Sequence, residues 1–153
     1  MIQVYRIADA CQPIWSGQGA TLCGGRGNNP GEPLIYTSLS YACAMLEVLI
    51  HSSIGRVPKN HKCVVATIGS NVSVERHDRN TLPAVWGDRF NVTSRRFGDD
   101  WLREARSAVL IIPSVVAPFE SNALINPLHP DFPKIAANSS IDVVWDPRLF
   151  DQN

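Results

Sequence analysis

The chain has 153 residues, of which 44% are apolar and 18% charged, a balance that fits a single globular domain over residues 1–153. Its 14 basic and 14 acidic side chains cancel to a formal net charge of zero. Proteins that bind the nucleic-acid backbone usually carry a basic excess, so this balance argues against general nucleic-acid binding. The N-terminus does not resemble a signal peptide, and no apolar run approaches the roughly 20 residues that cross a bilayer. We therefore expect a cytoplasmic protein without membrane contact.

The first half of the chain predicts two strands, a long loop and a helix. Residues 2–7 alternate with period two and predict a strand, and residues 34–37 predict a second one. Between them, the Gly- and Asn-rich stretch 17–31 predicts a long loop, a favoured place for a binding site. A helix is expected from about Tyr41 to His51, capped by Ser38 or Ser40. Its apolar face is expected to comprise Leu39, Ala42, Cys43, Leu46, Leu49 and Ile50.

The second half predicts more strands and a second helix. Strands are expected at 63–68, at 108–112, at 141–145 and, more weakly, at 72–74. Charges mixed with aromatic residues over 93–106 predict a surface helix in the second half of that segment. Residues 122–130, with their amides, histidine and prolines, predict a turn-rich loop. About six strands and two short helices, without strict β–α alternation, predict an α+β fold with a mixed, mainly antiparallel sheet.

Glu47 is the residue that most clearly indicates chemistry. It lies inside the apolar run 42–50, where a carboxylate is costly to bury unless it is paired. Among its neighbours at helical spacing, only His51 offers a polar partner. Glu47 therefore either points into solvent at the edge of the helix or lines a cleft, where its charge would count strongly.

Three further polar residues are candidates for a site. Arg26 lies in Gly24-Gly25-Arg26-Gly27, where glycines allow close backbone approach and a guanidinium suits a phosphate; the alternative is an ordinary turn with an exposed arginine. Tyr36 can stack on a flat ring or pack in the core. Ser114 follows a buried strand without a Gly-x-Ser-x-Gly elbow, which favours a polar ligand over a nucleophile; it can also simply face solvent.

Metal binding is not expected. The four cysteines are separated by 12, 20 and 20 residues, and none of the four histidines falls in an HExxH pattern.

The order and spacing of these signals resemble the RES-domain family, named for its arginine, glutamate and serine. The matching pieces are Val4-Tyr5-Arg6, Gly24-Gly25-Arg26 with Asn28, Ile35-Tyr36-Thr37-Ser38, Leu46-Glu47, Val109 to Pro118, Asn122, Asn126-Pro127 and His129-Pro130. One departure is Gly27, where the family commonly has a bulky aromatic residue.

The resemblance implies an ADP-ribosyltransferase-like fold and the toxin of a type II toxin–antitoxin pair. Such a toxin cleaves the nicotinamide–ribose bond of NAD, with water or inorganic phosphate as acceptor and no cofactor. Carried over to this sequence, Glu47 is the catalytic carboxylate, Arg26 grips the NAD phosphates or ribose, Tyr36 stacks near nicotinamide and Ser114 orients the substrate. The further substrate-binding residues are Arg6, Asn126 and His129.

The resemblance also implies a partner, because an enzyme that destroys NAD would poison its own cell. The expected partner is an antitoxin with a helix-turn-helix DNA-binding domain that blocks the cleft, so that the toxin, as a homodimer within the complex, meets DNA only indirectly. The alternatives are ADP-ribosyl transfer to a protein or nucleotide acceptor and a non-catalytic binding module. An RNA-cleaving toxin is disfavoured because the chain lacks a basic excess and paired catalytic histidines.

Overall fold

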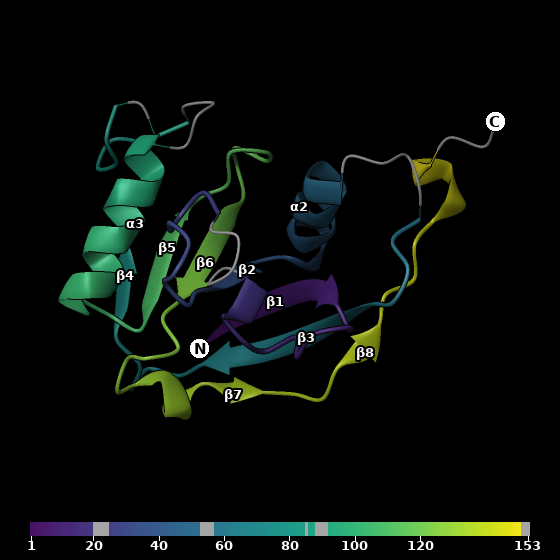
Figure 1. The fold of residues 1–153 in the computed structure, drawn as a ribbon, viewed down its shortest axis with the longest axis horizontal. Helices are drawn as coiled ribbons and strands as arrows, with labels where there is room; N and C mark the ends of the chain where they lie inside the picture. The colour runs from purple at the N-terminus through teal and green to yellow at the C-terminus, as the bar shows by residue number, and fades with distance from the viewer. Residues whose placement is uncertain (20–24, 53–56, 85, 88–91, 151–153) are drawn as a thin grey trace.

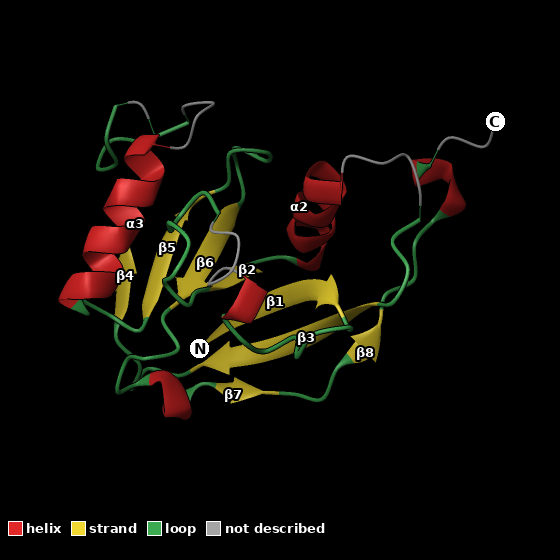
Figure 2. Ribbon diagram, viewed as in Figure 1, coloured by secondary structure: helices red, strands yellow, loops and turns green. Residues whose placement is uncertain are grey.

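The fold, in a computed structural model, is a mixed sheet with two described helices. The structure describes residues 1–19, 25–52, 57–84, 86–87 and 92–150. The strands lie in the order β4-β5-β6-β2-β1-β3-β7, and β8 also pairs with β3 (Figures 1 and 2). The elements are β1 (Ile2–Asp9), β2 (Ile35–Ser38), α2 (Tyr41–Ser52), β3 (His61–Ile68), β4 (Val74–Arg76), α3 (Val92–Glu104), β5 (Val109–Pro113), β6 (Ser121–Ile125), β7 (Ala136–Ala137) and β8 (Ile141–Asp142), with 3-10 turns at Phe132–Lys134 and Pro147–Leu149. Of these pairings only β4 with β5 is parallel, which confirms the predicted α+β class.

The sheet changes direction at β2. Strand β1 pairs with β3 along its whole length, but its register with β2 is the single pair Tyr5↔Ser38. Figure 1 accordingly shows β5 and β6 running across the direction of β1 and β3. The two halves of the sheet therefore meet at an angle, and β2 belongs to both.

Apolar packing holds a helix against each half of the sheet. Trp101 and Leu102 of α3 pack with Leu110, Ile112 and Leu124 of β5 and β6. The helix α2 packs over β1 and β3 in a cluster of Tyr5, Ile7, Tyr41, Ala44, Met45, Val48, Leu49, Cys63, Val65, Val143, Trp145 and Phe150. The opposite face of the sheet is filled by aliphatic residues that include Val4, Ile35, Ile68, Val109, Ile111 and Ile125. Burial of this apolar area is the main stabilising contribution to the fold.

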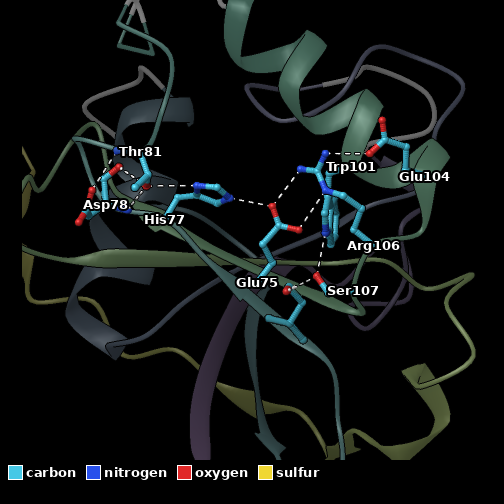
Figure 3. Close-up of polar contacts among 9 residues, drawn as sticks. Glu75, His77, Asp78, Thr81, Trp101, Glu104, Arg106 and Ser107 are labelled. Carbon is cyan, nitrogen blue, oxygen red and sulfur yellow. Dashed lines mark hydrogen bonds and ion pairs between the residues drawn. The ribbon is translucent and has the colours of Figure 1, made fainter.

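A polar network ties the C-terminal end of α3 to the edge strand β4 (Figure 3). Glu75 accepts hydrogen bonds from Arg106 Nε at 3.0 Å and Arg106 Nη2 at 2.9 Å, and His77 Nε2 lies 2.7 Å from the same carboxylate. Trp101 Nε1 donates to Ser107 Oγ at 2.9 Å directly below this group. Such a bidentate pair fixes orientation as well as position, so α3 is held in one place on the sheet.

Several predicted elements differ from those observed. Residues 122–130 were expected to form a loop, yet Ser121–Ile125 is the strand β6, because β5 and β2 on either side satisfy its backbone. The helix α3 starts at Val92 rather than in the second half of 93–106, the weak strand lies at Val74–Arg76, and the last strand ends at Asp142.

The apolar face predicted for α2 is also partly wrong. Ala42, Leu46 and Ile50 are exposed, and the helix instead buries the side that carries Ala44 and Val48 against β1 and β3. No helix in the described ranges is long and apolar enough to cross a membrane.

Candidate functional site

Glu47 of α2 is a partly buried carboxylate held by two neutral donors. Its Oε1 atom accepts a hydrogen bond from Ser114 Oγ at 2.9 Å and one from Asn122 Nδ2 at 2.7 Å. Its side chain keeps 23% of its surface exposed. Of the two alternatives left open by the sequence, the structure therefore shows the paired, partly buried carboxylate rather than one that points freely into solvent.

These partners meet because three strand ends lie at one edge of the sheet. Ser38 is the last residue of β2 and pairs in register with Asn122 of β6, while Ser114 directly follows β5. Ser114 N donates to Glu120 O at 2.9 Å and so closes the β5–β6 hairpin at this same edge. The helix α2 starts just after β2 (Figure 1), with Ser40 Oγ capping Cys43 N at 3.1 Å. Glu47 of this helix meets Ser114 and Asn122 at the same edge.

A second layer of contacts fixes these partners. Ser38 Oγ donates to Asn122 Oδ1 at 2.8 Å, and Ser114 Oγ accepts from Ala117 N at 3.0 Å. The predicted partner His51 contributes less, because its Nε2 lies 3.8 Å from Glu47 Oε2 and its side chain is 77% exposed. The carboxylate is thus oriented chiefly by the sheet.

Arg26 occupies the corner of a tight turn that Tyr36 supports from below. Gly25 N donates to Asn28 O at 3.0 Å, which places Arg26 and Gly27 at the corner; Gly24 lies outside the described residues. The Tyr36 hydroxyl donates to Asn28 Oδ1 and accepts from Gly27 N at 3.1 Å. Burial raises the pKa of Tyr36 to about 12, so its hydroxyl stays protonated at neutral pH. Tyr36 is therefore a packed residue with a satisfied hydroxyl that shapes the Arg26 turn.

The helix α3 also forms hydrogen bonds with the turn that carries Arg26. Arg95 Nε donates to Gly25 O at 2.7 Å, and Asp99 accepts two bonds from Asn29, one from its backbone N at 3.0 Å. Between them, a Cβ on Gly98 would lie only 1.6 Å from the Gly27 carbonyl oxygen. Helix and turn are thus in direct backbone contact, which only glycine at position 98 permits.

Gly27 is the position at which the family commonly has an aromatic residue, and here it is closely packed. A Cβ built on it would lie 2.6 Å from Leu124 Cδ1. A side chain at position 27 would therefore require the end of the Leu124 side chain to move.

The remaining predicted residues lie in two places. Arg6 donates through Nη1 to Tyr36 O at 2.9 Å and through Nε to Ile14 O, and burial lowers its pKa to about 10. Asn126 and His129 follow the other end of β6, about 13 Å along the strand from Asn122. There Asn126 Oδ1 accepts from Leu128 N, and His129 Nδ1 accepts from Asp131 N, both at 3.0 Å. The structure therefore brings Glu47 and Ser114 together and leaves Asn126 and His129 apart from them; their role as substrate ligands stays a prediction.

Two surface hollows are not lined by Glu47. One, of about 440 Å³, lies along α3 beside the Arg26 turn and is lined by Asn29, Val92, Arg95, Arg96, Asp99, Asp100 and Arg103. The other, of about 560 Å³, lies beside β8 and includes Cys11, His61 and Asp142. Within the described ranges no three acidic, histidine or cysteine side chains are grouped so as to hold a metal ion. The site is defined by the hydrogen bonds that converge on Glu47.

In this geometry the carboxylate of Glu47 lies at the end of β2, near Ser38. The turn that carries Arg26 rests on Tyr36, which lies two residues earlier on the same face of that strand. Comparison with known proteins identifies the class of this chain: the RES domain model matches residues 3–146. The chain belongs to the RES-domain family, and it is a toxin of that family.

Individual relatives cover most of the chain. It is 37% identical to the "Prs ADP-ribosylating toxin" of Sphingobium sp. (strain YBL2) over 88% of this chain and 85% of that protein. It is 34% identical to "Toxin Res" of Photorhabdus laumondii over 95% of this chain and 96% of that protein. Among solved structures, the toxin–antitoxin complex MbcT–MbcA of M. tuberculosis matches with a TM-score of 0.73 at 20% identity, covering 97% of this chain and 86% of the matched one. That likeness confirms the fold.

Sequence reasoning missed the residues that support the site. Asn122 was placed in a loop and Ser38 was assigned as a possible helix cap; beyond that, both were noted only as parts of the pieces that match the RES-domain family, and no site role was given to either, while nothing singled out Arg95, Gly98 or Asp99. The only available signal was indirect: a carboxylate in an apolar helix requires partners, and uncharged polar residues beside predicted strands are the ones that can supply them.

Proposed function

We propose that this toxin depletes NAD by cleaving its nicotinamide–ribose bond. The observation that carries the proposal is the carboxylate of Glu47, whose Oε1 is bound by the uncharged donors Ser114 and Asn122. Neither donor neutralises the carboxylate, so its negative charge is available to stabilise a cation. A group that is fixed in advance in this way stabilises charge developing in a transition state without the cost of reorganisation.

The chemistry follows from that charge. When the bond between ribose C1′ and the nicotinamide nitrogen breaks, nicotinamide leaves as a neutral molecule with the bonding electron pair. The ribose then acquires oxocarbenium character, as a sugar does in glycoside hydrolysis. Water attacks C1′ and loses a proton to give ADP-ribose; inorganic phosphate in its place gives the phosphate ester. Arg26 would bind the phosphates, for which a guanidinium is suited.

The test is to incubate the purified protein and its Glu47→Gln variant with NAD, with and without inorganic phosphate. Glutamine keeps the shape of the side chain but removes the charge, so we expect the variant to stay folded and to lose turnover by about 10²-fold or more. Nicotinamide release is measured together with the ribose product, which identifies the acceptor. A fully active Glu47→Gln variant would exclude the mechanism.

A second candidate function is ADP-ribosyl transfer to a macromolecule. It is favoured by the relative named "Prs ADP-ribosylating toxin", which shares 37% identity with this chain. The same carboxylate would serve, with a nucleophile of the acceptor in place of water. Label from adenine-labelled NAD would then appear in a protein or nucleic-acid fraction of a lysate, and purified toxin alone would release little nicotinamide.

The partner we propose is an antitoxin that covers Glu47 and carries a helix-turn-helix domain, within a complex in which the toxin is a homodimer. Exposed apolar side chains surround the carboxylate: Leu46 and Ile50 flank it on α2, and Val115 follows Ser114. A structural neighbour is also the toxin of a toxin–antitoxin complex. Co-expression should permit growth where the toxin alone arrests it; equal growth in both cases would contradict the proposal.

A further inference from the structure

We propose that Asn122 is a positioning residue for Glu47. Together with Ser114 it holds the carboxylate so that one oxygen, Oε2, faces the substrate. This inference rests on the proposed NAD-cleaving function. Asn122 lies on β6, in a segment whose sequence predicted a turn-rich loop, and the register of three strands places it against the carboxylate of Glu47 on α2.

The orientation of the Asn122 amide is determined by its surroundings. An ionised carboxylate can only accept hydrogen bonds, so the group facing Glu47 Oε1 at 2.7 Å must be the Nδ2 amino group. The carbonyl Oδ1 is then directed to Ser38, whose hydroxyl donates to it at 2.8 Å, with Cys43 Sγ at 3.6 Å. A flipped amide would place two acceptors against each other on the Glu47 side. The carboxylate of Glu47 therefore fixes Asn122 in the orientation that donates, and the Ser38 hydroxyl donates to the carbonyl on the other side.

The Ser114 hydroxyl also donates to Glu47. Its oxygen accepts from Ala117 N at 3.0 Å, so its hydroxyl hydrogen is directed to Glu47 Oε1 at 2.9 Å. Two donors from two different strands thus converge on one oxygen. The other oxygen, Oε2, lies 3.8 Å from Nε2 of the exposed His51.

This asymmetry has a mechanistic consequence. With Oε1 bound on two sides, the carboxylate cannot rotate about its last bond without losing both hydrogen bonds. Oε2 is then the oxygen that faces the ribose as it becomes cationic. Because a displacement of about 1 Å at a reacting centre can cost about 10²-fold in rate, loss of one donor is expected to reduce kcat rather than NAD binding.

The discriminating variants are Asn122→Ala and Asn122→Asp, with Asn138→Ala as control at an exposed asparagine. Asn122→Ala removes the donor, and we expect kcat to fall between tenfold and a hundredfold with KM for NAD within about twofold. Asn122→Asp places a second carboxylate against Glu47. At pH 8 the pair repels, but at lower pH it shares one proton, and the protonated oxygen can again donate.

The pH profile is therefore the decisive readout. Relative to wild type, kcat of Asn122→Asp should rise at least tenfold between pH 8 and pH 5, whereas kcat of Asn122→Ala should stay at a constant fraction. Circular dichroism melts report the folded fraction of each variant at each pH. Two results overturn the inference alone: an Asn122→Ala variant as active as wild type, or losses that follow the unfolded fraction. Wild-type protein that releases no nicotinamide overturns the proposed function instead.

Discussion

Replacing Gly98 with alanine tests whether contact with α3 holds the Arg26 turn in place. A Cβ at this position would lie 1.6 Å from Gly27 O and 2.6 Å from Gly27 C, whereas real Cβ contacts are essentially never below 3.0 Å. The helix and the turn must therefore separate by about 1.5 Å. Neither neighbouring atom is the end of a flexible side chain, so backbone has to move.

The expected fall in the free energy of unfolding follows from the hydrogen bonds between α3 and the turn. Separation stretches the bond from Arg95 to Gly25 O and the two bonds from Asn29 to Asp99. Hydrogen bonds to charged groups contribute about 1.5–3 kcal/mol each, and their partial loss would cost about 3–4 kcal/mol in total. The higher helix propensity of alanine returns about 1 kcal/mol. We expect the free energy of unfolding to fall by about 2–3 kcal/mol.

The assay combines urea unfolding with NAD turnover. A shift of the turn by more than 1 Å displaces Arg26, so kcat/KM should fall by about 10²-fold in protein that is still folded. Gly87→Ala is the matched control, because Gly87 is exposed and a Cβ there would meet nothing within 4 Å. If Gly98→Ala unfolds at the wild-type urea concentration and keeps wild-type activity, the turn is not held by α3 and the reasoning fails.

Two further predictions concern ionisable groups. Tyr36→Phe removes the hydroxyl that holds Asn28 and Gly27 N, so stability should fall by about 1–2 kcal/mol at pH 8 and KM for NAD should rise. The folded-state pKa of Tyr36 is raised from 10.0 to about 12, so its contribution is complete below pH 10 and is lost as pH rises toward 12. The difference in stability between wild type and Tyr36→Phe should therefore narrow by up to about 2 kcal/mol over that range. A difference that stays constant would contradict the assignment. For Glu75, burial works to raise the pKa, but the bonds from Arg106 and His77 outweigh it and lower the pKa below 4.5. The contribution of Glu75 to stability is thus present at pH 7 and is lost as the pH falls through its lowered pKa. In urea unfolding, the advantage of about 1 kcal/mol over Glu75→Gln at pH 7 should shrink as the solution is made acidic, and an advantage that does not change with pH would refute the ion pair.

The parts of the fold that could be predicted from sequence are those with a local signature. The alternation in β1 and the continuous apolar run of β5 each report burial directly, so both strands were predicted nearly at their observed bounds. The strand β6 was not predicted because Ser121 and Asn122 are polar and Asn126-Pro127 follows at once, which together indicate a turn. Its strand character comes from pairing on both edges, which is a property of the sheet and not of the segment.

The residues of the candidate site also differ in whether their role could be predicted from local sequence. Glu47 could be identified because a carboxylate in an apolar helix is anomalous in its own sequence context. Its donor Asn122 lies 75 residues away and reaches it only through the register of β6 with β2. Gly98 is still less visible, since a glycine within a charged surface helix predicts only a lower helix propensity; that it permits backbone contact with Gly27 follows from how α3 lies on the sheet.

The short strand β2 sets the geometry between the two halves of the site. Tyr36 supports the Arg26 turn and Ser38 donates a hydrogen bond to the Asn122 amide that binds Glu47, and these two residues are separated by about 7 Å on one face of the strand. A strand paired on both edges cannot easily change that spacing, so the anchor points of the arginine turn and the carboxylate are fixed relative to each other. Under the proposed function, Arg26 and Glu47 act on one dinucleotide, which requires a set distance between them. The spacing of Tyr36 and Ser38 on β2 fixes the two anchor points of that pair.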